Sequence, residues 1–164
     1  MFKEKYDIVV IGGGHAGVEA AHISSFLGSS VCLITMDQTA IARMSCNPAI
    51  GGLAKGQIVR EIDVLGGIMA ETADVSGIQF KTLNKSKGRA VWSPRAQIDK
   101  RVYEKIILNR IIKSPVSIVQ SEAISVDIQN YRVKSVLLRS GEKIKCSCLV
   151  VTAGTFLSGL IHIG

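Results

Sequence analysis

The sequence predicts an α/β fold with a parallel sheet, in which a Rossmann-like βαβ unit comes first. Two observations predict it: apolar, β-branched runs at residues 6–11 and 30–35, and a glycine-rich turn with a helical stretch between them. A short apolar run that glycine stops is typical of a buried parallel strand. Strand, glycine turn, helix and strand within about 30 residues make one βαβ unit.

The composition is that of a folded protein. The 164 residues are 47% hydrophobic and 20% charged, which excludes a disordered or low-complexity chain. No segment reaches the roughly 18 apolar residues of a membrane span, and no secretory signal follows the N-terminal lysines. We therefore expect a cytoplasmic protein that has no membrane partner and no disulfide framework among its four cysteines. The net charge of +7 weakly favours a polyanionic partner such as nucleic acid.

The first half of the chain alternates between helical and loop-like patterns. A helix at 18–27 is expected to end at Gly28 as its C-cap. Residues 44–56 are rich in glycine and small side chains, which predicts an ordered loop. A helix at 55–65 would then place one apolar face in the core, made of Ile58, Ile62 and Leu65.

The next segment predicts a polar loop followed by a long helix. Residues 81–94 are basic and show no periodicity. Residues 95–112 predict a helix whose buried stripe is Ile98, Val102, Ile106 and Ile111.

From Val116 onward the hydrophobic period changes to two, which predicts a β-meander. The turns carry Gln129-Asn130 and Ser140-Gly141. A final buried strand leads into Ala153 and Gly154. The expected strands are 116–119, 123–128, 132–138, 143–145 and 148–152.

The turn after the first strand has the spacing Gly12-x-Gly14-x-x-Gly17 of a dinucleotide fingerprint. Gly12 allows a tight turn, Gly14 lets a pyrophosphate approach the backbone, and Gly17 lets the helix pack against the strand. Because the turn opens a helix, unsatisfied N–H groups and the positive dipole end face the phosphates. The alternative is a purely structural turn. The expected nucleotide contacts are Gly12, Gly13, Gly14, His15, Ala16 and Gly17.

One position departs from the fingerprint. An acidic residue at the end of the second strand would hold the ribose hydroxyls, but that position is Thr35. A hydroxyl cannot act as a bidentate acceptor, so Thr35 is a weaker ribose contact and Asp37 is a further candidate.

Cys46 lies in a polar, glycine-rich loop that does not resemble packing sequence. A thiol there can be reached by substrate, and a cation or helix N-terminus nearby would favour the thiolate. The alternative is an idle loop cysteine.

Several motifs together resemble the glucose-inhibited division protein A (GidA, MnmG) family, the tRNA uridine 5-carboxymethylaminomethyl modification enzymes. The resemblance covers the whole chain. At Arg89 the chain departs from the family, which commonly has proline there; this changes the stiffness of the loop and adds a charge. The motifs are Gly-Gly-Gly-His-Ala-Gly, Ser-Cys-Asn-Pro-Ala-Ile-Gly-Gly, Glu-Ile-Asp-Val-Leu-Gly-Gly, Ser-Lys-Gly, Pro-Arg-Ala-Gln and Thr-Ala-Gly-Thr-Phe-Leu.

The resemblance implies an FAD-binding domain of the two-dinucleotide-binding flavoprotein type with a β-meander. Residues 1–164 would be its N-terminal part, with the remainder of the family's chain absent and the fragment alone inactive. The family's enzyme adds an aminomethyl-type group at C5 of the wobble uridine with a partner GTPase (MnmE). It uses methylene-tetrahydrofolate and NADH, whose site would lie outside this chain, and it is a homodimer. Carried over, Cys46 is catalytic as nucleophile or acid/base, Ile124 meets the adenine, and Ala153 and Gly154 lie near the FAD.

A basic segment at 81–113 holds ten of the 20 basic residues and only two acids. Such a segment can bind phosphates or be a solvated surface. We expect tRNA contacts at Lys85, Lys87, Arg89 and Arg95. No metal site is expected, because Cys146 and Cys148 have no second ligand pair.

Two other functions stay open. One is a flavin oxidoreductase of small molecules or thiols, which the absence of a Cys-x4-Cys pair after the second strand disfavours. The other is a non-catalytic nucleotide- or tRNA-binding module.

Overall fold

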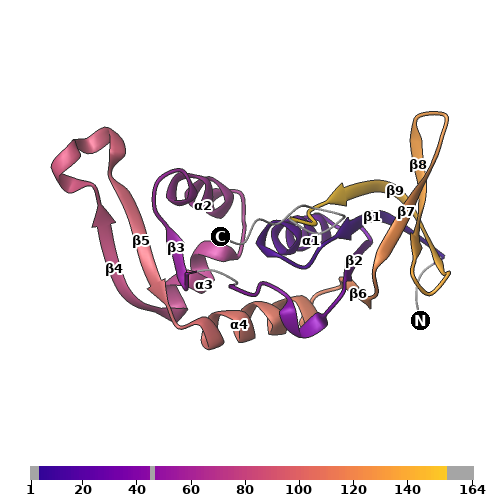
Figure 1. Cartoon of the computed structure of the whole chain (residues 1–164), viewed down its shortest axis with the longest axis horizontal. Coiled ribbons are helices and arrows are strands. Elements are labelled where there is room, and N and C mark those ends of the chain that lie inside the picture. Colours follow the sequence, from indigo (N-terminus) through magenta and orange to yellow (C-terminus); the bar gives the residue numbers. More distant parts are fainter. Residues whose placement is uncertain (1–3, 45–46, 155–164) are drawn as a thin grey trace, which may run out of the picture. The chain divides into compact units, whose positions relative to one another are not determined.

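A six-stranded sheet with the order β6-β2-β1-β9-β8-β7 is the framework of residues 1–42 and 111–164, here named the sheet unit. Residues 43–110 form a second compact unit, the inserted unit. The structure is a computed structural model, and it describes residues 4–44 and 47–154 (Figure 1). In that described part, no helix is long and apolar enough to cross a membrane.

The predicted parallel sheet is confirmed. It consists of β1 (Lys5–Ile11), β2 (Val31–Thr35), β6 (Ser117–Gln120) and β9 (Lys143–Val151), which pair with one another in parallel. All five residues of β2 are buried, as expected for a central strand.

The predicted βα connection is confirmed as well. Helix α1 (His15–Phe26) follows β1 and buries Gly17, Val18 and Ala21. It ends at Leu27, and Gly28 takes a positive φ of 90° after it, the usual conformation for a glycine in this position.

The β-meander is present, with three differences from the prediction. The strand expected at 116–119 corresponds to β6, which does not belong to the meander because it pairs in parallel with β2. Strands β7 (Ala123–Gln129) and β8 (Arg132–Leu138) form an antiparallel hairpin, and β8 pairs with β9. The strands expected at 143–145 and 148–152 are one continuous strand, because β9 exchanges β8 for β1 as its main partner along its length. The hairpin turn lies one residue later than expected, at Asn130 and Tyr131, which both have positive φ.

The core of the sheet unit lies between the parallel strands and the meander. Val9 and Ile11 of β1, Val136 and Leu138 of β8, and Ile144 and Cys146 of β9 belong to it, each pair two residues apart as in a strand with one face buried. Its buried residues are Tyr6, Val9, Ile11, Cys32, Ile34, Val119, Val136, Leu138, Ile144 and Cys146.

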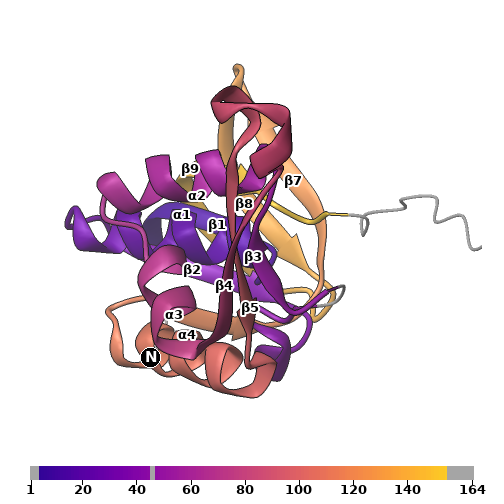
Figure 2. The same cartoon turned by 90° about the vertical axis from the view of Figure 1, so that its left-hand side faces the viewer.

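The inserted unit contains strands where the sequence predicts loops, which corrects two expectations. The loop expected at 44–56 contains β3 (Ala49–Gly51), and the polar segment at 81–94 overlaps β4 (Gly77–Leu83) and the start of β5 (Ser93–Ile98). These strands form an antiparallel sheet in the order β3-β5-β4. Figure 2 shows β4 and β5 running together toward a tip of short 3-10 turns.

The first two helices of the inserted unit differ from the prediction in their buried faces. Helix α2 (Lys55–Val64) forms, but it buries Gly56 and Val59, whereas Ile58 and Leu65 are exposed. Helix α3 (Met69–Ser76) was not predicted. Its hydroxyl side chains obscure the helical period, and yet Met69, Thr72, Ala73 and Ser76 are buried.

The long helix begins five residues later than predicted. Helix α4 spans Lys100–Lys113, and Asp99 begins it by accepting hydrogen bonds from the backbone N–H groups of Arg101 (3.0 Å) and Val102 (3.1 Å). The expected stripe is right at Ile111, and Ile98 is also buried, although it ends β5. It is wrong at Val102, which is exposed, because Tyr103 and Ile107 are the buried positions of the helix.

Candidate functional site

The carboxyl ends of β1, β2 and β9 meet at one edge of the sheet unit. The N–H of Gly12 donates to the carbonyl of Ile34 (2.9 Å), and the N–H of Thr152 donates to the carbonyl of Ile11 (2.8 Å). The Thr152 hydroxyl also donates to the carbonyl oxygens of Ile11 (2.9 Å) and Gly12 (3.1 Å). This edge, where the strand order reverses, is where open α/β sheets bind ligands.

The three fingerprint glycines differ in what a side chain would meet. A Cβ on Gly12 would lie 2.5 Å from the Thr152 carbonyl oxygen, and its φ of 108° also favours glycine. A Cβ on Gly17 would lie 1.8 Å from the Gly12 carbonyl oxygen. A Cβ on Gly14 would meet nothing within 4 Å. Gly12 and Gly17 are therefore required by packing, whereas Gly14 leaves open space beside the backbone.

That open space lies at the start of α1. Gly14 is the N-cap residue, with a φ of −71°, and it provides no side-chain cap. The first-turn N–H groups of a helix lack intrahelical partners and carry the positive end of its dipole. His15 is half-buried and Ala16 is exposed at this helix start. The arrangement is a cradle for an anionic group such as a pyrophosphate.

The side chain of Thr35 lies against Gly13 of this turn. It is buried, and a Cβ on Gly13 would lie 2.9 Å from its hydroxyl oxygen. The hydroxyl donates to the Asp37 carbonyl oxygen (3.2 Å). The Asp37 carboxylate accepts from the N–H (2.8 Å) and hydroxyl (2.6 Å) of Thr39, and so begins the 3-10 turn η1 (Gln38–Ala40). Both ribose candidates thus have local structural partners.

The other expected nucleotide contacts lie on segments that reach the same edge. Ser121 donates its N–H to the Thr35 carbonyl (2.9 Å), and Ile124 follows shortly after it in β7. Ala153 and Gly154 follow Thr152 directly, and Gly154 is exposed with a φ of 62°. The structure therefore brings Ser121, three residues before Ile124, and the end of β9 to the edge that carries the glycine turn.

Cys46 lies outside the described residues. The chain is anchored on both sides of it: the Met44 N–H donates to the Glu104 carboxylate (2.8 Å), and the Ile98 N–H donates to the Pro48 carbonyl (2.8 Å).

The expected tRNA contacts separate into two places in the inserted unit. Lys85, Lys87 and Arg89 are exposed on the turns between β4 and β5, whereas Arg95 is half-buried within β5.

Two of the cations of α4 have acidic partners. Arg110 makes a two-pronged contact with Glu71, and Lys100 lies 3.9 Å from Glu104. The hydrogen bond with Glu71 is the main reason that the pKa of Arg110 is raised. Lys85, Lys87 and Arg89 on the turns between β4 and β5, like Arg101, Lys105 and Lys113 of α4, are exposed.

Two cysteines of the sheet unit, Cys32 and Cys146, are buried. Burial raises the pKa of Cys32 to about 12, with a smaller contribution from Cys146, and burial also raises the pKa of Cys146. Both thiols are therefore protonated at neutral pH. Cys148 is exposed. Within the described residues, no group of three or more His, Cys, Asp or Glu side chains could hold a metal ion.

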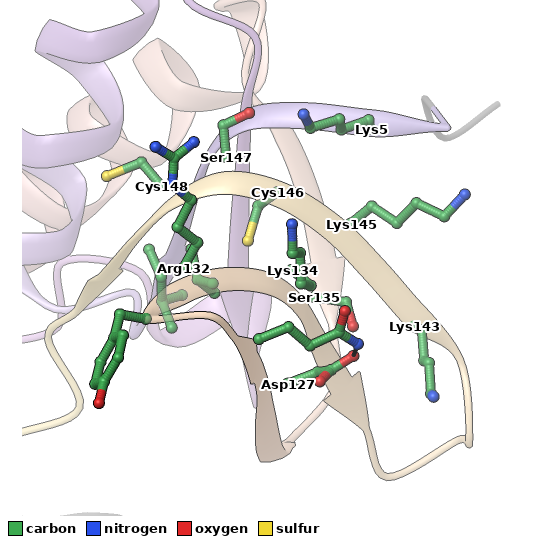
Figure 3. A pocket seen from close by; sticks show the side chains of 14 residues that line it. Lys5, Asp127, Arg132, Lys134, Ser135, Lys143, Lys145, Cys146, Ser147 and Cys148 are labelled. Carbon is green, nitrogen blue, oxygen red and sulfur yellow. Dashed lines mark hydrogen bonds between the residues drawn. The ribbon is translucent and has the colours of Figure 1, made fainter.

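A groove of about 990 Å³ opens where β8 and β9 diverge (Figure 3). Arg132 and Lys134 rise from β8 toward β9, and Lys143 points away. Its lining includes Lys5, at the start of β1, whereas the glycine turn follows the other end of that strand. The groove is therefore separate from the nucleotide cradle.

A glycine cradle at the carboxyl edge of a parallel sheet, followed by a β-meander, defines a dinucleotide-binding α/β domain. The chain belongs to the family described as Glucose inhibited division protein A, whose model matches residues 7–164. It is 52% identical over 163 residues to the tRNA uridine 5-carboxymethylaminomethyl modification enzyme MnmG of Sulfurihydrogenibium sp., covering 98% of this chain and 26% of that protein. The chain thus spans about a quarter of the length of the curated relatives it matches.

Solved structures agree with this assignment. GidA of Aquifex aeolicus, in its form I crystal, matches 93% of this chain and 26% of its own with a TM-score of 0.89 and 46% identity. PqsL of Pseudomonas aeruginosa, described as a probable FAD-dependent monooxygenase, matches 88% of this chain and 41% of its own with a TM-score of 0.62 and 16% identity. At that identity the second match shows the fold alone.

Proposed function

We propose that this chain is the N-terminal portion of an FAD-dependent tRNA-modifying enzyme. The enzyme would add a carboxymethylaminomethyl or aminomethyl group at C5 of the wobble uridine, in the cytoplasm, together with a partner GTPase. The observation that carries the proposal is the 52% identity, over nearly the whole chain, to a relative named for this modification. NADH, methylene-tetrahydrofolate and homodimerisation belong to the same proposal, with the NADH site outside this chain.

The residues at the sheet edge fit a dinucleotide such as FAD. The open space beside Gly14 and the first turn of α1 would receive the pyrophosphate. Thr35 would lie on the ribose side, the backbone at Ile124 on the adenine side, and Ala153 and Gly154 at the flavin end. FAD, when bound, supplies two-electron redox chemistry. The role of this chain would be to bind and orient the FAD.

The role proposed for Cys46 follows from the resemblance and from its loop. As a thiolate it would act as nucleophile toward the uridine ring, and as a thiol it would act as acid or base. Met44 and Pro48, on either side of it, are held by hydrogen bonds to Glu104 and Ile98.

The RNA-binding part of the proposal rests on the β4–β5 hairpin. Neutralising Lys85, Lys87 and Arg89 to glutamine should remove up to three phosphate contacts. Since each contact to a single strand contributes about 0.7 to the slope of log K against log salt, the slope should fall by about 2. A matched control neutralises Arg139 and Lys145, which already pair with Glu122 and Glu4. An unchanged slope in the triple variant would exclude this hairpin as a tRNA contact.

The cofactor part has its own test. The purified chain, mixed with FAD and freed of excess by gel filtration, should be yellow with one FAD per chain. A folded but colourless protein would contradict the proposal that these residues hold the cofactor. The experiment is independent of RNA binding, so the two parts of the proposal can fail separately.

A further inference from the structure

The tip of the β4–β5 hairpin, residues 84–92, is folded by its own hydrogen bonds. The Lys87 N–H donates to the Asn84 carbonyl (2.9 Å), and the Trp92 N–H donates to the Arg89 carbonyl (3.2 Å). The Asn84 side-chain amide donates across the tip to the Val91 carbonyl (3.4 Å). The side chains of this hairpin tip are therefore carried on an ordered loop.

Trp92 is held in a fixed orientation at this tip. Its indole N–H donates to the Lys85 carbonyl (3.2 Å), and the Arg89 guanidinium lies 5.8 Å from its ring centroid, within cation–π range. Even so, 41% of Trp92 is exposed. An indole whose polar atom is satisfied while much of its ring stays in water offers apolar surface for a planar ligand, at little further cost in side-chain entropy.

The surroundings of the ring are positively charged. No acidic residue occurs between Asp74 and Asp99, whereas that interval carries five cations. Lys85 and Lys87 are exposed beside Trp92 on the same tip. A planar ligand that brings its own phosphates matches this combination. Single-stranded nucleic acid is recognised in this way, with bases stacked on aromatic rings and the backbone held by cations.

We propose that Trp92, with Arg89 against its ring, is a stacking platform for an unpaired base of the RNA that the hairpin tip binds. The inference rests on the proposed function, since it takes RNA as the ligand of the hairpin. It goes further because it assigns a base contact to Trp92, which is not one of the cations expected to bind phosphates. The cations contact phosphates, whereas Trp92 contacts the base itself.

Tryptophan fluorescence reports on this contact directly, because Trp92 is the single tryptophan of the chain. The two probes are a 12-residue oligouridylate and an abasic oligomer with the same number of phosphates. Stacking predicts that oligouridylate quenches the Trp92 emission and binds more tightly than the abasic oligomer, with affinities measured by fluorescence anisotropy of end-labelled strands.

Three variants test the assignment. Trp92→Leu should weaken oligouridylate binding about 10-fold while leaving the abasic oligomer unaffected, because only the stacking contribution is lost. Trp92→Phe keeps an aromatic ring and should retain most of the preference. Tyr131→Leu removes a fully exposed aromatic from the β7–β8 hairpin and should change neither affinity. Circular dichroism verifies that each variant is folded.

The outcomes separate the two levels of the proposal. Equal affinity and equal quenching for both probes would show phosphate binding alone, which overturns the stacking platform and leaves the RNA-binding hairpin standing. Binding of neither probe would overturn both. An emission shift that grows with protein concentration in the absence of RNA would assign Trp92 to a protein contact and overturn the inference.

Discussion

Replacing Gly17 with alanine should destabilise the sheet unit, whereas the same change at Gly14 should not. The new Cβ at position 17 would lie 1.8 Å from the Gly12 carbonyl oxygen and 2.6 Å from the Thr152 hydroxyl oxygen, both below the 3.0 Å that such contacts keep. The first of these atoms belongs to the backbone and cannot rotate away. Helix α1 must therefore move off the end of β1.

The cost follows from this overlap. Overpacking a tight site typically costs about 1–3 kcal/mol, and contact with backbone atoms places Gly17→Ala near the upper end. For a chain of this size, about 3 kcal/mol lowers the melting temperature by about 6–12 °C. Gly14→Ala meets nothing within 4 Å, and its φ of −71° suits alanine. It should cost only about 0.5 kcal/mol, from the poorer N-cap.

Urea unfolding of the wild type and both variants measures the difference. FAD titration of the folded proteins supplies a second readout, in which Gly14→Ala should bind at least 10-fold more weakly because its methyl group occupies the space assigned to the pyrophosphate. Equal stability of Gly17→Ala and wild type would refute the packing argument. Unaltered FAD affinity in Gly14→Ala would refute the placement of the cofactor.

Three further predictions concern stability. Tyr131→Gly should raise the free energy of unfolding by about 0.5–1 kcal/mol, because Tyr131 has a φ of 59° in the two-residue hairpin turn; urea unfolding checks it, and a loss of stability would count against the turn geometry. Asp99→Ala should cost about 1 kcal/mol by removing the cap of α4, whereas Asp99→Asn should be nearly neutral; equal effects of the two would exclude the cap. The pKa of Cys32 is raised to about 12 in the folded state, so its stabilising effect is complete below the unfolded value of 9.0 and is lost as pH rises toward 12. Between those values wild type should lose about 1.4 kcal/mol per pH unit more than Cys32→Ala, and parallel stability curves would contradict burial of the thiol.

The sequence predicts the sheet unit well because its signals are local and redundant. The run at 6–11 is apolar, β-branched and stopped by glycine, and each of these properties indicates the same buried strand. Gly12 and Gly17 could be assigned from spacing alone, since the backbone contacts at those positions admit no side chain.

The inserted unit is harder to predict because tertiary contacts override its local pattern. Thr72 and Ser76 look like surface residues, yet they are buried and donate their hydroxyls to the carbonyls four residues earlier. The start of α4 was misplaced for a simpler reason. Asp99 is a strong N-cap signal, but the apolar Ile98 before it matches a helical stripe as well as it matches the end of a strand.

The position of β9 in the sheet sets the order in which the two units can form during synthesis. Thr152 bonds to Gly12 across 140 residues of chain, and β1 gains β9 as a partner only after the rest of the described chain has been made. The inserted unit is continuous in sequence, so its loops close sooner and at a smaller entropic cost. On a ribosome, residues 43–110 can fold while β1 still has an open edge. Until β9 has been made, this edge of β1 is open to pairing with another chain, and closing it is the slow and aggregation-prone step of this topology.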